Sequence, residues 1–139
     1  MSIDIDLLCK ELKRDEGYRG LIYSCSAGKL TYGYGHNGQD NPIPETIATA
    51  LLGHDIGQAL AQCEKWPWFY GLSDVRKRVI VNMVFNLGFE GVCKFKKMIE
   101  AIEAGDYVKA AWEMQDSDWR RQVGARADRL CSMMANNDI

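Results

Sequence analysis

Three polar side chains near the start of the chain have types that could act together on a covalent bond. Glu16 is followed nine residues later by Cys25, and Thr31 lies six residues further on. A carboxyl whose pKa is raised by a partly dry cleft can deliver a proton to a poor leaving group, and a hydroxyl can hold a water molecule. Taken singly, each residue has an ordinary explanation as a solvated glutamate, a small apolar cysteine or a β-branched strand residue. Acid–base chemistry therefore requires a fold that brings the three together.

The segment that carries them, Glu16–His36, has the pattern of a β-hairpin that follows a helix. Two β-prone runs, 21–23 and 30–32, flank a four-residue turn at 26–29 that contains a glycine, which is typical of a hairpin. We therefore expect a hairpin over about residues 20–35. Glu16 would then lie at the junction between a helix and a small sheet, where a side chain can face a cleft.

Apolar residues before this segment recur with the period of a helix. The spacing i, i+3, i+4 and i+7 is found at Ile5, Leu8, Cys9 and Leu12. This spacing predicts an amphipathic helix over residues 4–15. Ser2 could cap its start, and Gly17 can end it.

The remainder of the chain is predicted to be almost entirely helical. The polar stretch 37–44 is expected to be a loop because it contains glycine and proline. An apolar stripe then predicts a long helix over about 44–65, followed by an aromatic cluster at 66–70 that we expect to pack as hydrophobic residues. Later helices are predicted over about 74–87, 95–104, 107–115, 117–123 and 125–134. Their predicted caps are Ser73, Asp106 and either Asp116 or Ser117, and their predicted stops are Gly88, Gly105 and Gly124. One hairpin among many helices makes the fold class α+β, mostly helical.

Composition and charge bound the class of protein. At 139 residues the chain is predicted to be one domain, and a net charge of −2 gives no general affinity for nucleic acid. The first residues lack the pattern of a signal peptide, and no run reaches the roughly 18 apolar residues of a membrane span. We therefore expect no stable membrane association. The five cysteines are scattered and form no C-x-x-C pair, so free thiols are expected rather than disulfides or a zinc site.

Three ordered segments of the chain resemble a known family. The first is the spaced triplet described above, followed by Gly-Tyr-Gly-His at 33–36. The second is Asn-Met-Val-Phe-Asn-Leu-Gly at 82–88, with Phe95 after it. The third is Trp-x-x-Gln-x-x-x-Arg-Ala-x-Arg at 119–129. Together they extend over nearly the whole chain and resemble the phage-type lysozymes, the T4-like muramidases of glycoside hydrolase family 24.

The resemblance implies a lysozyme-like fold in a single domain, residues 1–139. A small N-terminal lobe with a β-hairpin (about 1–45) would be joined by a long helix (about 44–65) to a helical C-terminal lobe (66–139). It implies an endolysin with muramidase activity, an enzyme that hydrolyses β-1,4 bonds between N-acetylmuramic acid and N-acetylglucosamine in bacterial peptidoglycan to lyse the host cell. No metal or organic cofactor is implied. We expect a monomer that stays in the host cytoplasm until a holin gives it access to the periplasm and cell wall.

The resemblance also implies catalytic roles for the three residues of the first segment. Glu16 would be the general acid, and Thr31 would hold the attacking water on the opposite face of the sugar. Most relatives have an aspartate at the position of Cys25, although the family pattern also accepts cysteine. A thiol is uncharged near neutral pH because its ordinary pKa is about 8.5. Three roles therefore stay open for Cys25: base, electrostatic stabiliser or nucleophile.

Four more residues match family positions with supporting roles. The resemblance implies a structural ion pair between His36 and Asp55, rather than a catalytic or metal-binding histidine. It implies that Arg126 lies near the catalytic glutamate, where a cation would steady the carboxylate, and that Phe85 belongs to the substrate cleft. The plainer alternatives are a solvated helix arginine for Arg126 and a core residue for Phe85.

Two other functions fit parts of the same pattern. A lytic transglycosylase needs one acid but no water-positioning residue, because the 6-hydroxyl of the sugar attacks; Thr31 at its family spacing argues against this function. A non-catalytic peptidoglycan-binding module would have lost its site at Cys25. The retained Glu16, Thr31 and Arg126 argue against that loss. A muramidase is therefore the predicted function.

Overall fold

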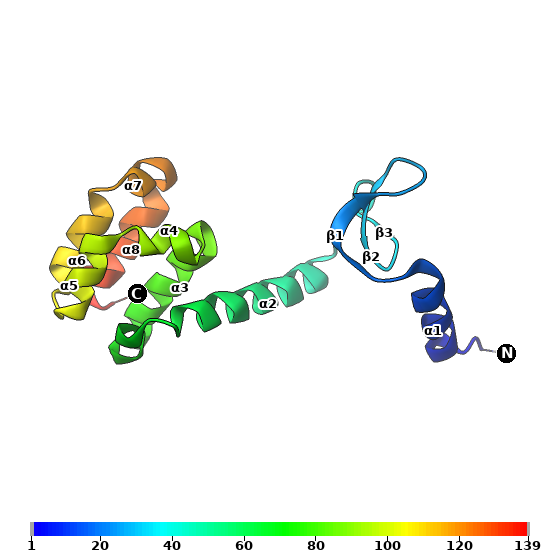
Figure 1. The fold of residues 1–139 in the computed structure, drawn as a ribbon, viewed down its shortest axis with the longest axis horizontal. Coiled ribbons are helices and arrows are strands. Elements are labelled where there is room, and N and C mark those ends of the chain that lie inside the picture. The colour runs from blue at the N-terminus through cyan, green and yellow to red at the C-terminus, as the bar shows by residue number, and fades with distance from the viewer. Residues whose placement is uncertain (1, 139) are drawn as a thin grey trace. The chain divides into compact units, whose positions relative to one another are not determined.

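Helices make up most of the computed structural model, which describes residues 2–138 (Figure 1). The elements in chain order are α1 (Ile5–Glu16), β1 (Arg19–Ser24), β2 (Leu30–Gly33), β3 (His36–Asn37), α2 (Glu45–Cys63), the 3-10 helix η1 (Pro67–Gly71), α3 (Asp74–Leu87), α4 (Phe89–Cys93), α5 (Lys96–Glu103), α6 (Tyr107–Gln115), α7 (Asp118–Val123) and α8 (Ala125–Asn136). A small antiparallel sheet among these helices confirms the predicted α+β, mostly helical class. No helix within residues 2–138 has the length and apolar character needed to cross a bilayer.

The chain divides into two compact units, Met1–Thr49 and Ala50–Ile139. The division falls inside α2, whose bounds agree closely with the long helix predicted over about 44–65. The predicted lobes differ from these units because the long helix was treated as a separate connection between them, whereas the structure divides the chain within that helix. The organisation of both lobes into one domain, 1–139, stays a prediction.

Helix α1 begins and ends at residues that satisfy its free backbone groups. The side chain of Asp4 accepts a hydrogen bond from the backbone N–H of Leu7 at 3.0 Å, so Asp4 is the cap and the prediction of Ser2 was wrong. The reason is positional, since a capping side chain must immediately precede the first helical residue. Gly17, with φ of 70°, ends the helix and leaves Glu16 as its last residue, as the sequence indicated.

The sheet of the first unit has the strand order β1-β2-β3, with both pairs antiparallel. Thr31 on the central strand pairs with Tyr23 of β1 on one side and with Asn37 of β3 on the other. The hairpin of β1 and β2 was predicted, but β3 was assigned to a loop. A strand of two residues has no hydrophobic alternation of its own, so only pairing with β2 defines it.

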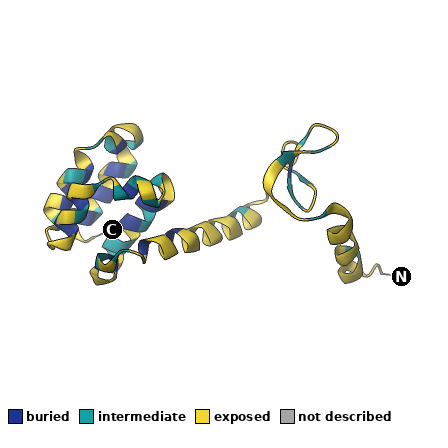
Figure 2. Cartoon of the chain, in the orientation of Figure 1, coloured by how far each residue is buried: buried dark blue, intermediate teal, exposed yellow. Residues whose placement is uncertain are grey.

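The second unit has one apolar core formed by α3 to α8, with contributions from η1 and the end of α2. Figure 2 shows its buried residues as dark blue faces turned toward one another. Its largest fully buried side chains are Ile80, Met83, Met98, Met114, Met134, Val79, Val92 and Cys63. The aromatic cluster packs as hydrophobic residues, as predicted. Phe69 is buried, and the ring centroid of Trp66 lies 4.9 Å from that of Trp68 and 4.5 Å from that of Phe89 on α4.

One arginine ties three helices of this unit together. Arg76 on α3 donates hydrogen bonds to the carbonyl oxygens of Met134 at 2.8 Å and Ala135 at 3.3 Å, near the end of α8. Its guanidinium also lies 3.8 Å from the ring centroid of Tyr107, the first residue of α6. The last carbonyls of a helix have no partner within the helix, so Arg76 satisfies groups that would otherwise need water.

Polar caps and glycine stops define most of the remaining helix ends where the sequence placed them. Ser73, Asp106 and Ser117 each accept a hydrogen bond from a backbone N–H three residues later. Gly88 and Gly124 have positive φ and end α3 and α7. Two short elements, η1 and α4, were not predicted, because about five residues are too few to show a helical period.

Removing a buried side chain should test where this core lies. Ile80 has no exposed surface, so Ile80→Ala should lower the free energy of unfolding by about 2–5 kcal/mol. The matched control is Val108→Ala, because Val108 is 69% exposed on α6 and its truncation should change stability by no more than about 0.5 kcal/mol. Urea unfolding followed by circular dichroism measures both; equal effects would contradict the assigned core.

Candidate active site

Glu16 lies where the end of α1 meets the turn between β2 and β3. A Cβ atom at position 35 would lie only 2.5 Å from Oε2 of Glu16, so the carboxyl group packs directly on the Gly35 backbone. Two aromatic contacts join the same parts: Nζ of Lys13 lies 5.5 Å from the ring centroid of Tyr34, and the rings of Tyr18 and Tyr34 are 5.7 Å apart. The turn therefore contacts the carboxyl of the candidate acid, and Glu16 is otherwise exposed.

Cys25 and Thr31 lie on the same face of the sheet. Thr31 pairs with Tyr23 across the β1–β2 ladder, and residues two apart on an extended chain point to the same side, which places Cys25 beside them at the end of β1. His36 instead pairs with Tyr32, one residue along β2 from Thr31. Its side chain therefore belongs to the opposite face, which argues against a catalytic group made of His36, Cys25 and Thr31.

The tight turn after β1 surrounds the Cys25 sulfur with hydrogen-bond donors. The backbone N–H of Cys25 donates to the Lys29 carbonyl at 2.9 Å, and that of Gly28 donates to the Cys25 carbonyl at 2.8 Å. This turn directs the N–H groups of Lys29 and Ala27 at the sulfur. These two hydrogen bonds lower the pKa of the Cys25 thiol below its ordinary value, and the Thr31 hydroxyl adds to them against a smaller opposing effect of burial. The fold therefore stabilises the thiolate of Cys25 more than an unfolded chain would.

Thr31 is buried, with 3% of its surface exposed. Its hydroxyl donates to the carbonyl oxygen of Lys29 at 2.9 Å, and the Cys25 sulfur is a second acceptor for the same proton. One hydroxyl proton serves one strong acceptor at a time, so an ionised Cys25 competes with Lys29 for it. In either arrangement the oxygen keeps lone pairs that can accept a hydrogen bond from water.

His36 has one buried ring nitrogen, Nε2, with no hydrogen-bond partner among residues 2–138. Its ring packs edge-on against Tyr32 at 5.2 Å. A buried polar atom without a hydrogen-bond partner lowers the stability of the folded state, so a partner for Nε2 would stabilise this part of the fold. Asp55 lies on α2 in the second unit, and its predicted pairing with His36 stays a prediction.

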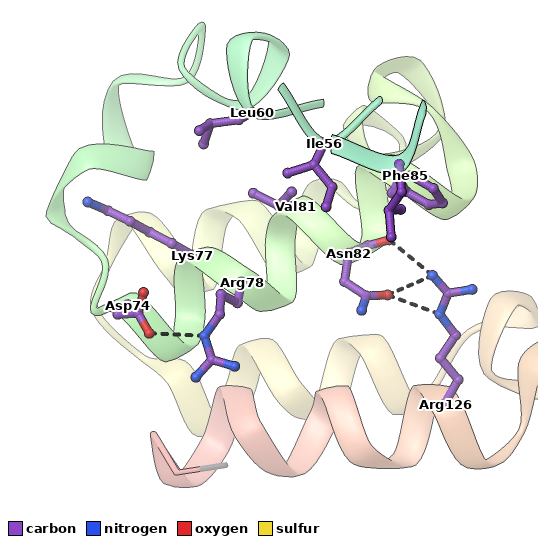
Figure 3. Close-up of a pocket in the computed structure, with 10 residues that line it drawn as sticks. Ile56, Leu60, Asp74, Lys77, Arg78, Val81, Asn82, Phe85 and Arg126 are labelled. Atoms are coloured by element: carbon purple, nitrogen blue, oxygen red, sulfur yellow. Dashed lines mark hydrogen bonds and ion pairs between the residues drawn. The ribbon is translucent and has the colours of Figure 1, made fainter. Parts of the chain in front are cut away.

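In the second unit, Phe85 and Arg126 line one cavity of about 590 Å³, as Figure 3 shows. Phe85 is 45% exposed, which disfavours the alternative that it is a core residue. Arg126 donates to Oδ1 of Asn82 from Nε at 3.0 Å and from Nη2 at 2.7 Å. The guanidinium is therefore held in a fixed orientation rather than being free in solvent.

Sequence reasoning missed the roles of two asparagines, whose side chains hydrogen-bond the segment 82–88 to the segment 119–129. Asn82 holds Arg126, and Oδ1 of Asn86 accepts a hydrogen bond from the indole N–H of Trp119 at 2.8 Å. Trp119 is itself buried and packs edge-on against Phe95 at 6.1 Å. Residues 82 and 86 are one helical turn apart and face the same way; this i, i+4 pair was the signal in the sequence.

The predicted site residues fall into two groups. In the first unit, the structure brings Cys25 and Thr31 together. The carboxyl of Glu16, at the end of α1, packs against the turn between β2 and β3. Phe85 and Arg126 share a cavity of the second unit.

Comparisons with known proteins cover both groups. Residues 13–133 match the family model described as phage lysozyme. The chain is 28% identical to probable T4-type lysozyme 1 of Dictyostelium discoideum, over 92% of this chain and 93% of that protein. It is 33% identical to the endolysin of Acyrthosiphon pisum secondary endosymbiont phage 1, over 73% of this chain and 70% of that protein. It is also 27% identical to pre-baseplate central spike protein Gp5 of Enterobacteria phage T4, over 95% of this chain but only 28% of that longer protein.

The lowered pKa of Cys25 predicts its reactivity. In a Cys9→Ser/Cys93→Ser variant, the rate of alkylation by iodoacetamide should rise with pH with a midpoint below the ordinary value for a thiol, because the thiolate is the nucleophile. Burial raises the pKa of Cys63 and of Cys131 to about 11, so these two remain thiols near neutral pH. Mass spectrometry of the labelled peptides identifies the modified residue.

The same variant unfolded in urea is the control for this titration. Unfolding removes the backbone N–H groups from the sulfur, so the midpoint for Cys25 should return to about 8.5. Identical midpoints in the folded and unfolded protein would show that the turn at 25–29 does not stabilise a thiolate. Resistance of Cys25 to the reagent in the folded protein would show that the side chain is buried.

Proposed function

Because this chain belongs to the phage lysozyme family and is a glycoside hydrolase of the lysozyme type, we propose that Glu16, Cys25 and Thr31 carry out its reaction. The enzyme is an endolysin that cleaves the β-1,4 bond between N-acetylmuramic acid and N-acetylglucosamine in peptidoglycan. The observation that carries the residue assignment is the arrangement of the first unit. Cys25 and Thr31 share one face of the sheet, and the carboxyl of Glu16 packs against the turn between β2 and β3.

In the proposed reaction Glu16 donates its proton to the glycosidic oxygen as the bond to the sugar carbon breaks. A sugar alkoxide is a poor leaving group, and protonation allows it to depart as a neutral hydroxyl. Positive charge develops on the anomeric carbon at the same time. A water molecule held by the Thr31 hydroxyl attacks that carbon from the opposite face, and its proton is lost to a nearby base or to solvent.

We assign to Cys25 the electrostatic role that a carboxylate would have. The N–H groups of Lys29 and Ala27 favour its thiolate, and a negative charge beside the anomeric carbon would stabilise the developing cation. The Thr31 hydroxyl lies close enough to the sulfur to link the charge and the water. Cys25 acts by its position and charge in this proposal, not by covalent attack.

The remaining residues have supporting roles in the proposal. Arg126 steadies the ionised carboxylate after proton transfer, and the fixed orientation that Asn82 gives its guanidinium supports this role. Phe85 contacts the saccharide, which its exposure on a cavity wall supports. We also propose the structural ion pair between His36 and Asp55 that the family resemblance implies.

We further propose where and with what the enzyme acts. It works as a monomer without a cofactor, accumulates in the host cytoplasm, and reaches the periplasm and wall when a holin opens the membrane. The chain has no general attraction for nucleic acid, which its net charge of −2 supports.

Glu16→Gln tests the assignment of the acid. The substituted side chain is nearly the same size but cannot deliver a proton, so lysis should slow by about 10²–10⁴-fold while the melting temperature stays close to that of the wild type. The matched control is Glu11→Gln, a change of the same kind on the exposed surface of α1, which should leave activity unchanged. The assay is the fall in turbidity of Gram-negative cells whose outer membrane has been permeabilised; near-native lysis by Glu16→Gln would contradict the assignment.

A further inference from the structure

One close contact in the first unit bears on how the candidate acid is held in place. Gly35, in the turn between β2 and β3, lies against the carboxyl end of Glu16. We propose that Gly35 is a positioning residue, whose missing side chain leaves the space in which the Glu16 carboxyl sits. The proposal rests on the proposed function of Glu16 as the general acid.

The contact involves the whole end of the glutamate side chain. A Cβ atom on residue 35 would lie 2.5 Å from Oε2, 2.9 Å from Cδ and 3.4 Å from Cγ of Glu16. The first two distances are too short for nonbonded atoms, so any other residue at position 35 would displace either the carboxyl group or the turn. Gly35 also has φ of 72°, a backbone conformation that disfavours other residues.

The carboxyl is the part that moves most easily, because it is the end of a flexible side chain, whereas the backbone on either side of it has contacts of its own. Glu16 is the last residue of α1, and Gly17 closes the helix by donating its N–H to the Lys13 carbonyl at 3.0 Å. The turn is held to this helix end through Tyr34, which contacts both Lys13 and Tyr18. A methyl group at position 35 would therefore rotate the Glu16 side chain away from its place.

A neighbouring glycine provides a control that separates contact from backbone strain. Gly33 is the last residue of β2, directly before the turn, and has φ of 68°, close to that of Gly35, yet a Cβ atom there would meet nothing within 4 Å. Alanine at either position imposes a similar backbone strain. Only alanine at position 35 also collides with Glu16.

The experiment compares kcat, KM and melting temperature of Gly35→Ala and Gly33→Ala on soluble peptidoglycan fragments. Both variants should melt at a lower temperature than the wild type, but only Gly35→Ala should lower kcat, by up to about 10²-fold, since a small misplacement of a reacting group can cost that much. KM should change little, because the acid acts in the transition state. Native kcat in folded Gly35→Ala, or an equal loss of kcat in both variants, would overturn the proposal.

A second comparison keeps the test decisive if Gly35→Ala does not fold. Glu16→Ala removes the carboxyl that the new methyl group would strike, so Gly35→Ala should lower the melting temperature less in that background than in the wild type. Gly33→Ala should lower it equally in both backgrounds. Equal effects of Gly35→Ala in both backgrounds would overturn the proposal. This stability coupling does not depend on catalysis, so activity that survives in Glu16→Gln would refute the proposed acid without altering the steric result.

Discussion

The proposed chemistry depends on one junction, the packing of the end of α1 on the turn between β2 and β3. A general acid works only if its carboxyl is held close to the bond that breaks. Here the helix end carries Glu16, the turn supplies the surface of Gly35, and Tyr34 fastens the turn to Lys13 and Tyr18. The junction is formed by backbone and aromatic contacts, and Oε2 of Glu16 packs against Gly35 within it.

The sheet organises the other two residues through its register. Because side chains alternate along a strand, a slip of one residue would send Thr31 to the opposite face, where His36 belongs. The turn after β1 lowers the pKa of the Cys25 thiol, because its backbone N–H groups stabilise the charged form of the sulfur. Backbone hydrogen bonds, rather than a neighbouring cation, are the main cause of the lowered pKa.

Much of this fold could be predicted from local chemistry. Capping side chains at Ser73, Asp106 and Ser117 and stops at Gly88 and Gly124 have direct partners or positive φ in the structure, and a local signal is sufficient for them. The elements that the sequence did not predict lack such a local signal. Strand β3 exists only through its pairing with β2, and α4 is too short to show a period.

The candidate site shows the same division between local and long-range information. The spacing of Glu16, Cys25 and Thr31 is a property of the sequence, and the family resemblance selected them as the predicted catalytic residues. The contact of Glu16 with Gly35 and the bond of Asn82 to Arg126 join residues distant along the chain. Neither residue type predicts such a contact, because glycine and asparagine are also common in turns and on surfaces.

In the proposed reaction, an acid and a held water molecule cleave the glycosidic bond in one displacement. Proton NMR of the product, recorded before the anomers equilibrate, distinguishes this reaction from its alternatives. A single displacement inverts the anomeric centre, so a β-1,4 bond should first give the α-anomer of the new reducing sugar. An initial β-anomer would show a covalent intermediate and make Cys25 a nucleophile, and an anhydro sugar without a reducing end would show that no water attacks.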